Sequence, residues 1–488
     1  MGHSATKYEQ VESRIAGLID CGTLRGGQRI PSVRAMAVQM RVSVMTVLQG
    51  YRRLEDRGLI ESRPKSGYFV RPELMRRVSQ PALPPPPQVD PIRLSSPSVR
   101  IPDLAAALLL QKERPNLLPL GAGVPSAQLL PGEALSVRLA RAVRSCPDEA
   151  SRYAPGIGLQ RLREQLALRM LDSGCSLGPD ELLVTVGATE ALSVALQAVA
   201  EPGDVVAVES PGYLGFYAAL ARLHLRTVEV QSDPTTGLSL PVLERLLSRH
   251  DRVRALVLCS TNSNPTGSTM PERDKQALVE ICRRAGVIIV EDDTFGDVTF
   301  TDRRACSLKS LDPENVVYIG SLSKVLSPGC RIGWVAGGRH HGKLVDCHLA
   351  TVLAAPTSTQ MAVASFLADG AMVHHLRRLG RHCNDSAALM RRAIAGALPK
   401  GTKVTNPGGG LFLWVELPEG CDSCSLMRAA VTRGFSVASG RLFSSGKHYG
   451  RFLRLNTAIV WSETVEKAFR ALGSLVRDQL KGSSASGG

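Results

Sequence analysis

The chain has 488 residues, 44% of them hydrophobic, and a formal net charge of +15 at pH 7. This length exceeds one ordinary hydrophobic core, so two or more domains are expected, and no uninterrupted apolar run is long enough to cross a bilayer. The first ten residues lack the cationic start and apolar stretch of a secretion signal. The eleven cysteines show no metal-ligand spacing beyond a lone Cys421-x-x-Cys424, so we expect reduced thiols, no metal site and a cytoplasmic protein.

The positive charge is enriched at the N-terminus. Residues 1–80 contain 14 Lys and Arg against 7 Asp and Glu, which supplies +7 of the +15. Such an excess permits binding to a polyanion such as DNA, although many basic proteins have no polyanionic partner.

Residues 30–56 predict two capped helices. Ser32 and Ser43 each precede a helical pattern and can accept a hydrogen bond from its first turn. The second helix is amphipathic and is predicted to end near Asp56. Its predicted buried stripe is Val47, Tyr51 and Leu54, and its exposed face carries Thr46, Gln49, Arg52 and Arg53.

Residues 59–70 predict a β-hairpin with a basic tip at Lys65, Ser66 and Gly67. Two helices, a tight turn and a hairpin make a winged helix-turn-helix, whose second helix enters the major groove of DNA. The alternative is a winged helix used for protein contacts, which the basic tip disfavours.

The segments PSVRAMA, VSVMTV and GLIESRPKSGYFV in residues 1–71 resemble the GntR family of bacterial regulators. The resemblance implies that Arg34, Ser43 and Thr46 contact phosphate or base edges of double-stranded DNA, with Gln49 on the same exposed helix and the hairpin tip as the wing. The family often has arginine directly after the Ser43 position. Val44 stands there in this chain, so a bidentate guanine contact is missing.

A linker and connecting segment is predicted at residues 72–114. It includes PALPPPP at 81–87, which cannot form helix or sheet ladders and is expected to be an extended, semi-rigid spacer.

From residue 115 to 480, short apolar strands alternate with amphipathic helices. The predicted strands are 182–186, 205–208, 255–259, 287–290 and 316–319. This alternation predicts an α/β fold with a mainly parallel sheet covered by helices on both faces. A smaller α/β subdomain is expected from about 370, and a disordered Gly/Ser-rich tail at 481–488.

Lys324 lies in GSLSKVLSPGCRIGW, a segment that resembles a pyridoxal-phosphate attachment site. A lysine that forms a Schiff base must be held close to a phosphate anchor, and Ser321 and Arg331 supply a hydroxyl and a guanidinium suited to a phosphate ester. A lone lysine in a Ser-rich loop is ordinarily a solvated surface residue. The hypothesis therefore depends on other parts of the chain.

Two of those parts follow predicted strands. Gly187, Ala188 and Thr189 open a helix whose N–H groups and dipole favour an anion, although many strand–helix turns look similar. Asp292, at the end of a strand, can pair with a pyridinium nitrogen and keep it protonated. The structural alternative for this carboxylate is turn capping, for which Asp293 is the better candidate.

Three more side chains complete the predicted site. Asn264, in a turn-forming NPTG segment, can donate to the phenolic oxygen of the cofactor. Tyr213 can stack on the pyridine ring or be an ordinary core tyrosine. Arg454 interrupts an apolar strand, where it can hold a substrate carboxylate by two hydrogen bonds or form an internal salt bridge.

This ordered set resembles the fold type I aminotransferases across about 115–475. The resemblance implies the roles just described, with Lys324 in Schiff-base linkage to pyridoxal phosphate and a phosphate cup formed by Ala188, Thr189, Ser321 and Arg331. It also matches Tyr153 to a tyrosine that reaches the phosphate of the neighbouring subunit, which implies a homodimer. Phe295 stands where the family usually has a tyrosine that bonds the ring oxygen, so turnover is in doubt.

Fusion of a GntR winged helix to an aminotransferase-like domain resembles the MocR subfamily of regulators. The resemblance implies a transcription factor that binds operator DNA as a homodimer and senses a small amino compound through pyridoxal phosphate. Two alternatives stay open: a working aminotransferase with a secondary winged helix, and a regulator that responds to pyridoxal phosphate itself.

Overall fold

The computed structural model describes residues 6–20, 24, 27–56, 59–63, 66–71, 83, 117–250, 252–301, 303–446 and 448–485. The chain divides into two compact units, Met1–Ser79 and Gln80–Gly488. Of the predicted linker at 72–114, only Leu83 is described, and the predicted wing-tip residue Lys65 also lies outside the described residues. Among the described residues, no helix combines the length and apolar character needed to span a membrane.

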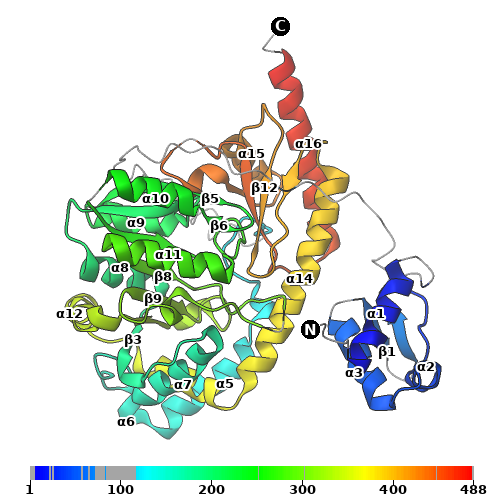
Figure 1. Ribbon diagram of the computed structural model, residues 1–488, viewed down its shortest axis with the longest axis horizontal. Helices are drawn as coiled ribbons and strands as arrows, with labels where there is room; N and C mark the ends of the chain where they lie inside the picture. Colours follow the sequence, from blue (N-terminus) through cyan, green and yellow to red (C-terminus); the bar gives the residue numbers. More distant parts are fainter. Residues whose placement is uncertain are drawn as a thin grey trace. The chain divides into compact units, whose positions relative to one another are not determined.

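The N-terminal unit is built from short helices and a hairpin (Figure 1). Its described elements are α1 (Lys7–Asp20), α2 (Val33–Met40), α3 (Val44–Asp56), β1 (Ile60–Arg63) and β2 (Gly67–Val70). The strands pair antiparallel from Ile60↔Val70 to Arg63↔Gly67. The predicted winged helix-turn-helix is confirmed.

Both predicted caps form. Ser32 Oγ accepts the N–H of Ala35 at 3.2 Å, and Ser43 Oγ accepts the N–H of Thr46 at 3.1 Å. The predicted stripe of α3 is fully buried, and its members are Val47, Tyr51 and Leu54. The core of this unit also takes in α1, through the fully buried Val11 and Ile15.

The C-terminal unit is organised around a sheet in the order β3-β10-β9-β8-β7-β4-β5-β6. Its strands are β3 (Leu182–Thr185), β4 (Val205–Ser210), β5 (Arg226–Asp233), β6 (Gly237–Leu238), β7 (Val253–Leu258), β8 (Ile288–Asp292), β9 (Val316–Ser321) and β10 (Gly333–Ala336). The pairs from β9 through β8, β7 and β4 to β5 are parallel, which confirms the mainly parallel prediction. Strand β10 runs antiparallel to β9 and β3, and β6 runs antiparallel to β5.

Helices cover both faces of this sheet (Figure 1). The helices of this part of the chain are α5 (Gly132–Ser145), α6 (Pro147–Ala150), α7 (Gln160–Met170), α8 (Ala188–Val199), α9 (Leu214–Arg222), α10 (Leu240–Arg249), α11 (Glu272–Ala285), α12 (His341–Thr351) and α13 (Thr357–Ala368). Alternate residues of β4 show the two-sided burial: Val206 and Val208 pack with α8 and α9, whereas Val205 and Ala207 pack with α10 and α11. A strand buried on both faces reads as a continuous apolar run.

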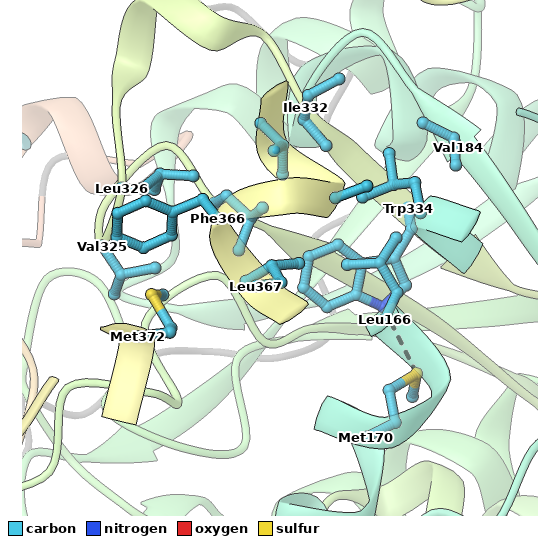
Figure 2. Packing of buried hydrophobic residues seen from close by; sticks show 14 of the residues in the cluster. Leu166, Met170, Val184, Val325, Leu326, Ile332, Trp334, Phe366, Leu367 and Met372 are labelled. Carbon is cyan, nitrogen blue, oxygen red and sulfur yellow. Dashed lines mark hydrogen bonds between the residues drawn. The ribbon is translucent and has the colours of Figure 1, made fainter. Parts of the chain in front are cut away.

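A further apolar cluster joins the sheet to α7 and α13 (Figure 2). Trp334 lies at its centre, and its indole N–H donates to the Met170 sulfur at 3.3 Å. Val325 and Leu326, directly after Lys324, are fully buried and belong to the same cluster. The backbone beside Lys324 is therefore anchored in a close-packed core.

The C-terminal part carries a second sheet in the order β11-β12-β14-β13, all antiparallel. Its elements are α14 (Ala371–Ala397), β11 (Lys403–Val404), β12 (Phe412–Glu416), α15 (Ser423–Thr432), β13 (Ala438–Ser439), β14 (Phe452–Asn456) and α16 (Glu463–Ala485). The predicted disordered tail at 481–488 is wrong for residues 481–485, because α16 continues to Ala485. Leu480 packs against the core of this part, and helix propagation from an anchored turn is inexpensive. Residues 486–488 lie outside the described residues.

Candidate functional site

The candidate site lies where strands of the central sheet end. Strands β3, β4, β7, β8 and β9 point the same way, so the loops that follow them meet at one edge of the sheet. This is the usual ligand-binding edge of an open α/β sheet. The loops carry Gly187, Tyr213, Asn264 and Lys324, Asp292 is the last residue of β8, and Arg454 comes from β14.

Lys324 is held in an apolar and electropositive setting. Its Nζ lies 5.8 Å from the centre of the Phe295 ring. Burial, followed by the charge of Arg454, lowers the pKa of Lys324 to about 8, and Asp292 opposes the shift. A lowered pKa leaves more of the amine neutral near physiological pH, which is the form that attacks a carbonyl carbon.

Asp292 ends β8 and is buried beside Lys324. Its Oδ1 accepts the N–H of Thr294 at 3.0 Å. Burial raises the pKa of this carboxyl, whereas the Thr294 hydrogen bonds and the Lys324 charge lower it. The turn contact expected of Asp293 is thus made by Asp292, because Asp293 instead bonds Arg304 and the Tyr318 hydroxyl.

A corner rich in hydrogen-bond donors forms where Arg331 meets the start of α8. The Arg331 guanidinium donates to Val186 O at 3.0 Å and to Ser323 Oγ at 3.3 Å, and Ser321 Oγ bonds Ser323 Oγ at 3.1 Å. No side chain caps the N-terminus of α8. A Cβ added at Gly187 would lie 2.3 Å from Arg331 Nη2, so only glycine allows this approach.

The sequence did not single out the residues that hold this corner in place. Glu190 Oε2 accepts the N–H of Val186 at 2.6 Å, and Glu190 Oε1 lies 2.7 Å from Nδ1 of the fully buried His348. The partners are 158 positions apart, so no local pattern reveals them. Ser323 was not among the predicted site residues either, although it lies only two positions after Ser321 in the sequence.

Arg454 lies buried without a carboxylate partner in the described part of the chain. It donates to Asn264 Oδ1 at 2.8 Å and to Gly121 O at 2.6 Å. The rings of Phe412 and Phe443 lie 4.5 and 4.9 Å from its guanidinium carbon. Burial lowers the pKa of Arg454 to about 10. Among the described residues, the internal salt bridge considered from the sequence is absent.

Phe443 is fixed by an unpredicted contact between the central sheet and the segment that follows Phe443. Buried Glu229 on β5 accepts from Ser210 Oγ at 2.6 Å, Ser444 Oγ at 2.8 Å and the N–H of Ser445 at 2.5 Å. These bonds hold the segment that follows Phe443. The aromatic wall beside Arg454 therefore depends on a carboxylate of the central sheet.

Tyr213 and Asn264 lie among the same charged groups. The Tyr213 ring packs edge-on against Phe216 at 5.5 Å between centroids. Burial and then the Asp292 charge raise the pKa of Tyr213, while Arg454 and Arg331 oppose the rise. Asn264 uses its carbonyl oxygen for Arg454, so its NH₂ group is the part left to face a ligand.

Tyr153 is not brought to this cluster. It follows α6 and is 83% exposed. The predicted DNA-contacting residues belong to the N-terminal unit, where Arg34 and Gln49 are exposed and Ser43 caps α3. Arg53, predicted on the exposed face of α3, is exposed and forms an ion pair with Glu12 at 2.8 Å.

Comparison with known proteins defines both units. Residues 116–472 match the family "Aminotransferase class I and II", and residues 7–70 match "Bacterial regulatory proteins, gntR family". The chain is 34% identical over 475 residues to the uncharacterized HTH-type transcriptional regulator YdcR of Escherichia coli, covering 97% of this chain and 100% of that protein. It belongs to the MocR-type regulators, in which a GntR winged helix is fused to an aminotransferase domain.

Two further similarities were found, one to a transcription regulator and one to an aminotransferase of known structure. The HTH-type pyridoxine biosynthesis transcriptional regulator PdxR of Corynebacterium glutamicum is 29% identical over 82% of this chain and 81% of its own length. The α-aminoadipate aminotransferase LysN of Thermus thermophilus, solved with N-(5'-phosphopyridoxyl)-L-leucine, superposes with a TM-score of 0.71 at 29% identity. That match covers 76% of this MocR-type chain and 95% of LysN.

The aminotransferase family binds pyridoxal phosphate, and the residues of this MocR-type chain fit that cofactor. The uncapped start of α8 and the guanidinium of Arg331 suit a phosphate ester. A buried carboxylate, Asp292, and a half-buried amine with a lowered pKa, Lys324, suit the ring nitrogen and the aldehyde. The glycine at 187 keeps the phosphate corner open.

Proposed function

We propose that this protein is a DNA-binding transcription regulator that senses an amino compound through pyridoxal phosphate bound in its aminotransferase domain. One observation carries the proposal: the same chain contains a winged helix and a domain in which Lys324, with its pKa lowered by burial, lies near an Arg454 that has no carboxylate partner among the described residues. The function requires both parts, because one binds operator DNA and the other a ligand whose binding can shift an equilibrium between conformations.

In this proposal Lys324 is the covalent attachment residue and Asp292 holds a proton on the ring nitrogen. Asn264 donates to the ring oxygen and Tyr213 packs on the ring. The phosphate is bound by Ala188, Thr189, Ser321 and Arg331. When bound, the cofactor supplies an electron-withdrawing ring to an amino compound.

The effector of this proposal carries a carboxylate as well as an amine. Arg454 offers a planar fork of donors in a water-poor setting between Phe412 and Phe443. Its pKa of about 10 reflects the cost of burying the charge without an anion. A carboxylate bound there removes that cost.

We also propose a homodimer, in which Tyr153 reaches the phosphate of the partner copy. Support comes from the 83% exposure of Tyr153 and from Leu349 and Leu353, which approach Gly156, three residues after Tyr153, and are 40% and 47% exposed. Leu349 lies against Gly156. Exposed apolar side chains gathered beside a site are typical of subunit contacts. A cytoplasmic location follows from the proposed role at DNA.

DNA binding is assigned to the exposed side of the N-terminal unit. Arg34, Ser43, Thr46 and Gln49 lie on α2 and α3 or at their starts, and Ser66 and Gly67 at the described edge of the wing. Lys65 completes the proposed tip. Phosphate contacts from the charged side chains Arg34 and Lys65 make the affinity depend on salt, because they release counter-ions from the duplex.

The test is a titration of promoter duplex with purified protein, with and without pyridoxal phosphate and a panel of amino acids. We expect operator affinity to change when an amino acid is added to the cofactor-loaded protein. Lys324→Ala is expected to keep the fold, lose the visible cofactor absorbance and lose this response. Borohydride reduction of the wild-type protein is the chemical control. An identical affinity in every state would contradict the sensor role.

A working aminotransferase is the second candidate, favoured by the joint presence of Lys324, Asp292 and Arg454 in one buried cluster. Steady-state assays over common amino donors and keto acids test it. Rapid multiple turnover would support this candidate and exclude a pure sensor.

Control by pyridoxal phosphate alone is the third candidate, favoured by the similarity to the pyridoxine biosynthesis regulator PdxR. It predicts that operator affinity follows the cofactor concentration with no amino compound present. Equal affinities of cofactor-free and cofactor-loaded protein would exclude it.

A further inference from the structure

The first turn of α3 exposes two adjacent apolar side chains. Val44 is 45% exposed and Met45 is 69% exposed, whereas Val47, Tyr51 and Leu54 of the same helix are fully buried. Because the buried stripe already anchors α3, the two exposed residues contribute nothing to the described core. They form an apolar patch at the helix start, hereafter the Val44–Met45 patch.

The polar neighbours of this patch are already engaged. Ser43 Oγ accepts the N–H of Thr46 at 3.1 Å and lies 2.8 Å from the Thr46 hydroxyl. Both hydroxyls therefore serve the helix cap. Gln49, one turn beyond Met45 on the same face, is the exposed amide next to the patch.

The surroundings of the patch are cationic. The stretch from Cys21 to Leu54 contains six arginines and no Asp or Glu. Of these, Arg34, Arg41 and Arg52 are exposed, and neither α2 nor α3 has an acidic residue in its first turn. An apolar patch at a helix N-terminus, in a unit that exposes arginines on the same two helices and the turn between them, fits a duplex, whose phosphates meet the cations while base edges meet the patch.

In the major groove the apolar group on a base edge is the C5 methyl of thymine. We propose that the Val44–Met45 patch reads thymine methyl groups in each operator half-site, with Gln49 bonding an adjacent adenine at N6 and N7. This inference rests on the proposed DNA-binding function. In this chain a contact to an A·T base pair therefore takes the place of the guanine contact that an arginine at position 44 would make.

The experiment selects duplexes from a random library with the full-length, cofactor-loaded protein and then replaces each thymine of the selected duplex by uracil. Uracil lacks only the methyl group, so base pairing is kept. We expect one or two positions per half-site at which uracil weakens binding about fourfold, the value for burying one methyl group. Elsewhere the replacement is expected to have no effect.

Protein variants link the effect to the patch. Met45→Ala and Val44→Thr are expected to weaken binding to the thymine duplex and to abolish the thymine–uracil difference. Val38→Ala is the matched control, because Val38 is an exposed apolar residue on α2, 80% exposed; it should leave that difference unchanged. Arg34→Ala is expected to weaken both duplexes equally and to reduce the salt dependence.

Two results overturn the inference and separate it from the proposed function. Selective binding with no uracil effect at any position, or an equal loss for both duplexes with Met45→Ala and Val44→Thr, overturns the methyl readout and leaves DNA binding intact. Failure to enrich any duplex overturns DNA binding and the methyl readout together.

Discussion

Two arginines with largely buried side chains in the C-terminal unit differ in whether nearby carboxylates neutralise their charge. Arg304 is neutralised by Asp293 and Asp297, the latter at 3.2 Å. Arg454 contacts only neutral oxygens and aromatic rings among the described residues. Burial opposes both charges, but the two carboxylates reverse its effect and raise the pKa of Arg304, whereas the pKa of Arg454 falls to about 10. A buried charge left without a counter-ion indicates a place for an anionic ligand.

The largest effect on stability is predicted for substitution of Arg304, whose charge is neutralised. Arg304→Met leaves Asp293 without its ion-pair partner, so we expect the free energy of unfolding to fall by about 3–5 kcal/mol. Urea denaturation measures this. Arg304→Met combined with Asp293→Asn is expected to recover part of the loss. A stable single variant would mean that the network does not hold the fold.

Arg454→Met is predicted to spare the fold and remove a ligand contact. Stability should stay unchanged or rise, because an uncompensated buried charge is removed. Affinity for amino acids should fall roughly thirtyfold or more, since a buried carboxylate loses its partner. Absorbance titration of the cofactor-loaded protein measures the affinity, with the corresponding amines that lack a carboxylate as the control ligands. A large loss of stability would mean that Arg454, like Arg304, stabilises the fold.

Lys324 extends the comparison to a second cation of the site whose charge is disfavoured by burial. Its pKa is about 8 in the folded protein against 10.5 for an ordinary lysine. Between these values the unfolded chain binds the extra proton, so raising the pH across this window stabilises the cofactor-free protein. We expect the stability advantage of Lys324→Met over wild type to shrink by roughly 1–3 kcal/mol from pH 8 to pH 10.5. Denaturation at several pH values tests this, and a constant difference would contradict the lowered pKa.

The smallest effect is predicted for Phe295→Tyr. Phe295 packs edge-on against Phe412 at 5.0 Å and lies under Lys324. A hydroxyl here can donate to the ring oxygen of bound pyridoxal phosphate and favour its ionised form. We expect the pH midpoint of the cofactor absorbance to fall by up to about one unit, with the fold retained. Phe295→Leu is the control without a hydroxyl, and the same shift in both variants would rule out the hydrogen bond.

Local signals carried most of the successful fold predictions. Ser32 and Ser43 each precede a helix by one position and cap it through a neighbour three residues away. The apolar runs of the central strands are continuous because both faces of the sheet are covered. Local composition gave a wrong prediction at the C-terminus. The Gly/Ser-rich residues 481–485 were predicted to be disordered, but α16 continues through them as a helix.

The candidate site was visible in sequence only in part. Lys324, Asp292 and Asn264 stand in short recognisable segments, and their assigned roles stay predictions. Residues that hold the site in place from distant segments of the chain do not stand in such recognisable motifs. The fully buried His348 holds Glu190 and so the turn before α8, and Glu229 holds the segment after Phe443, in each case across more than 150 positions.

The amino-acid sequence by itself determined the order of elements, the winged helix and the alternating α/β domain, because caps, periodicity and motif spacing act over a few residues. Only the tertiary structure decided which arginines are neutralised by carboxylates. From the sequence, Arg454 was predicted to hold a ligand carboxylate or to form an internal salt bridge, Arg53 to be available to solvent or DNA, and Arg304 was not singled out. Their difference arises from carboxylates brought close by folding, as Asp297 is to Arg304 and Glu12 is to Arg53, and Coulomb energies depend on distance in space and on burial rather than on separation along the chain.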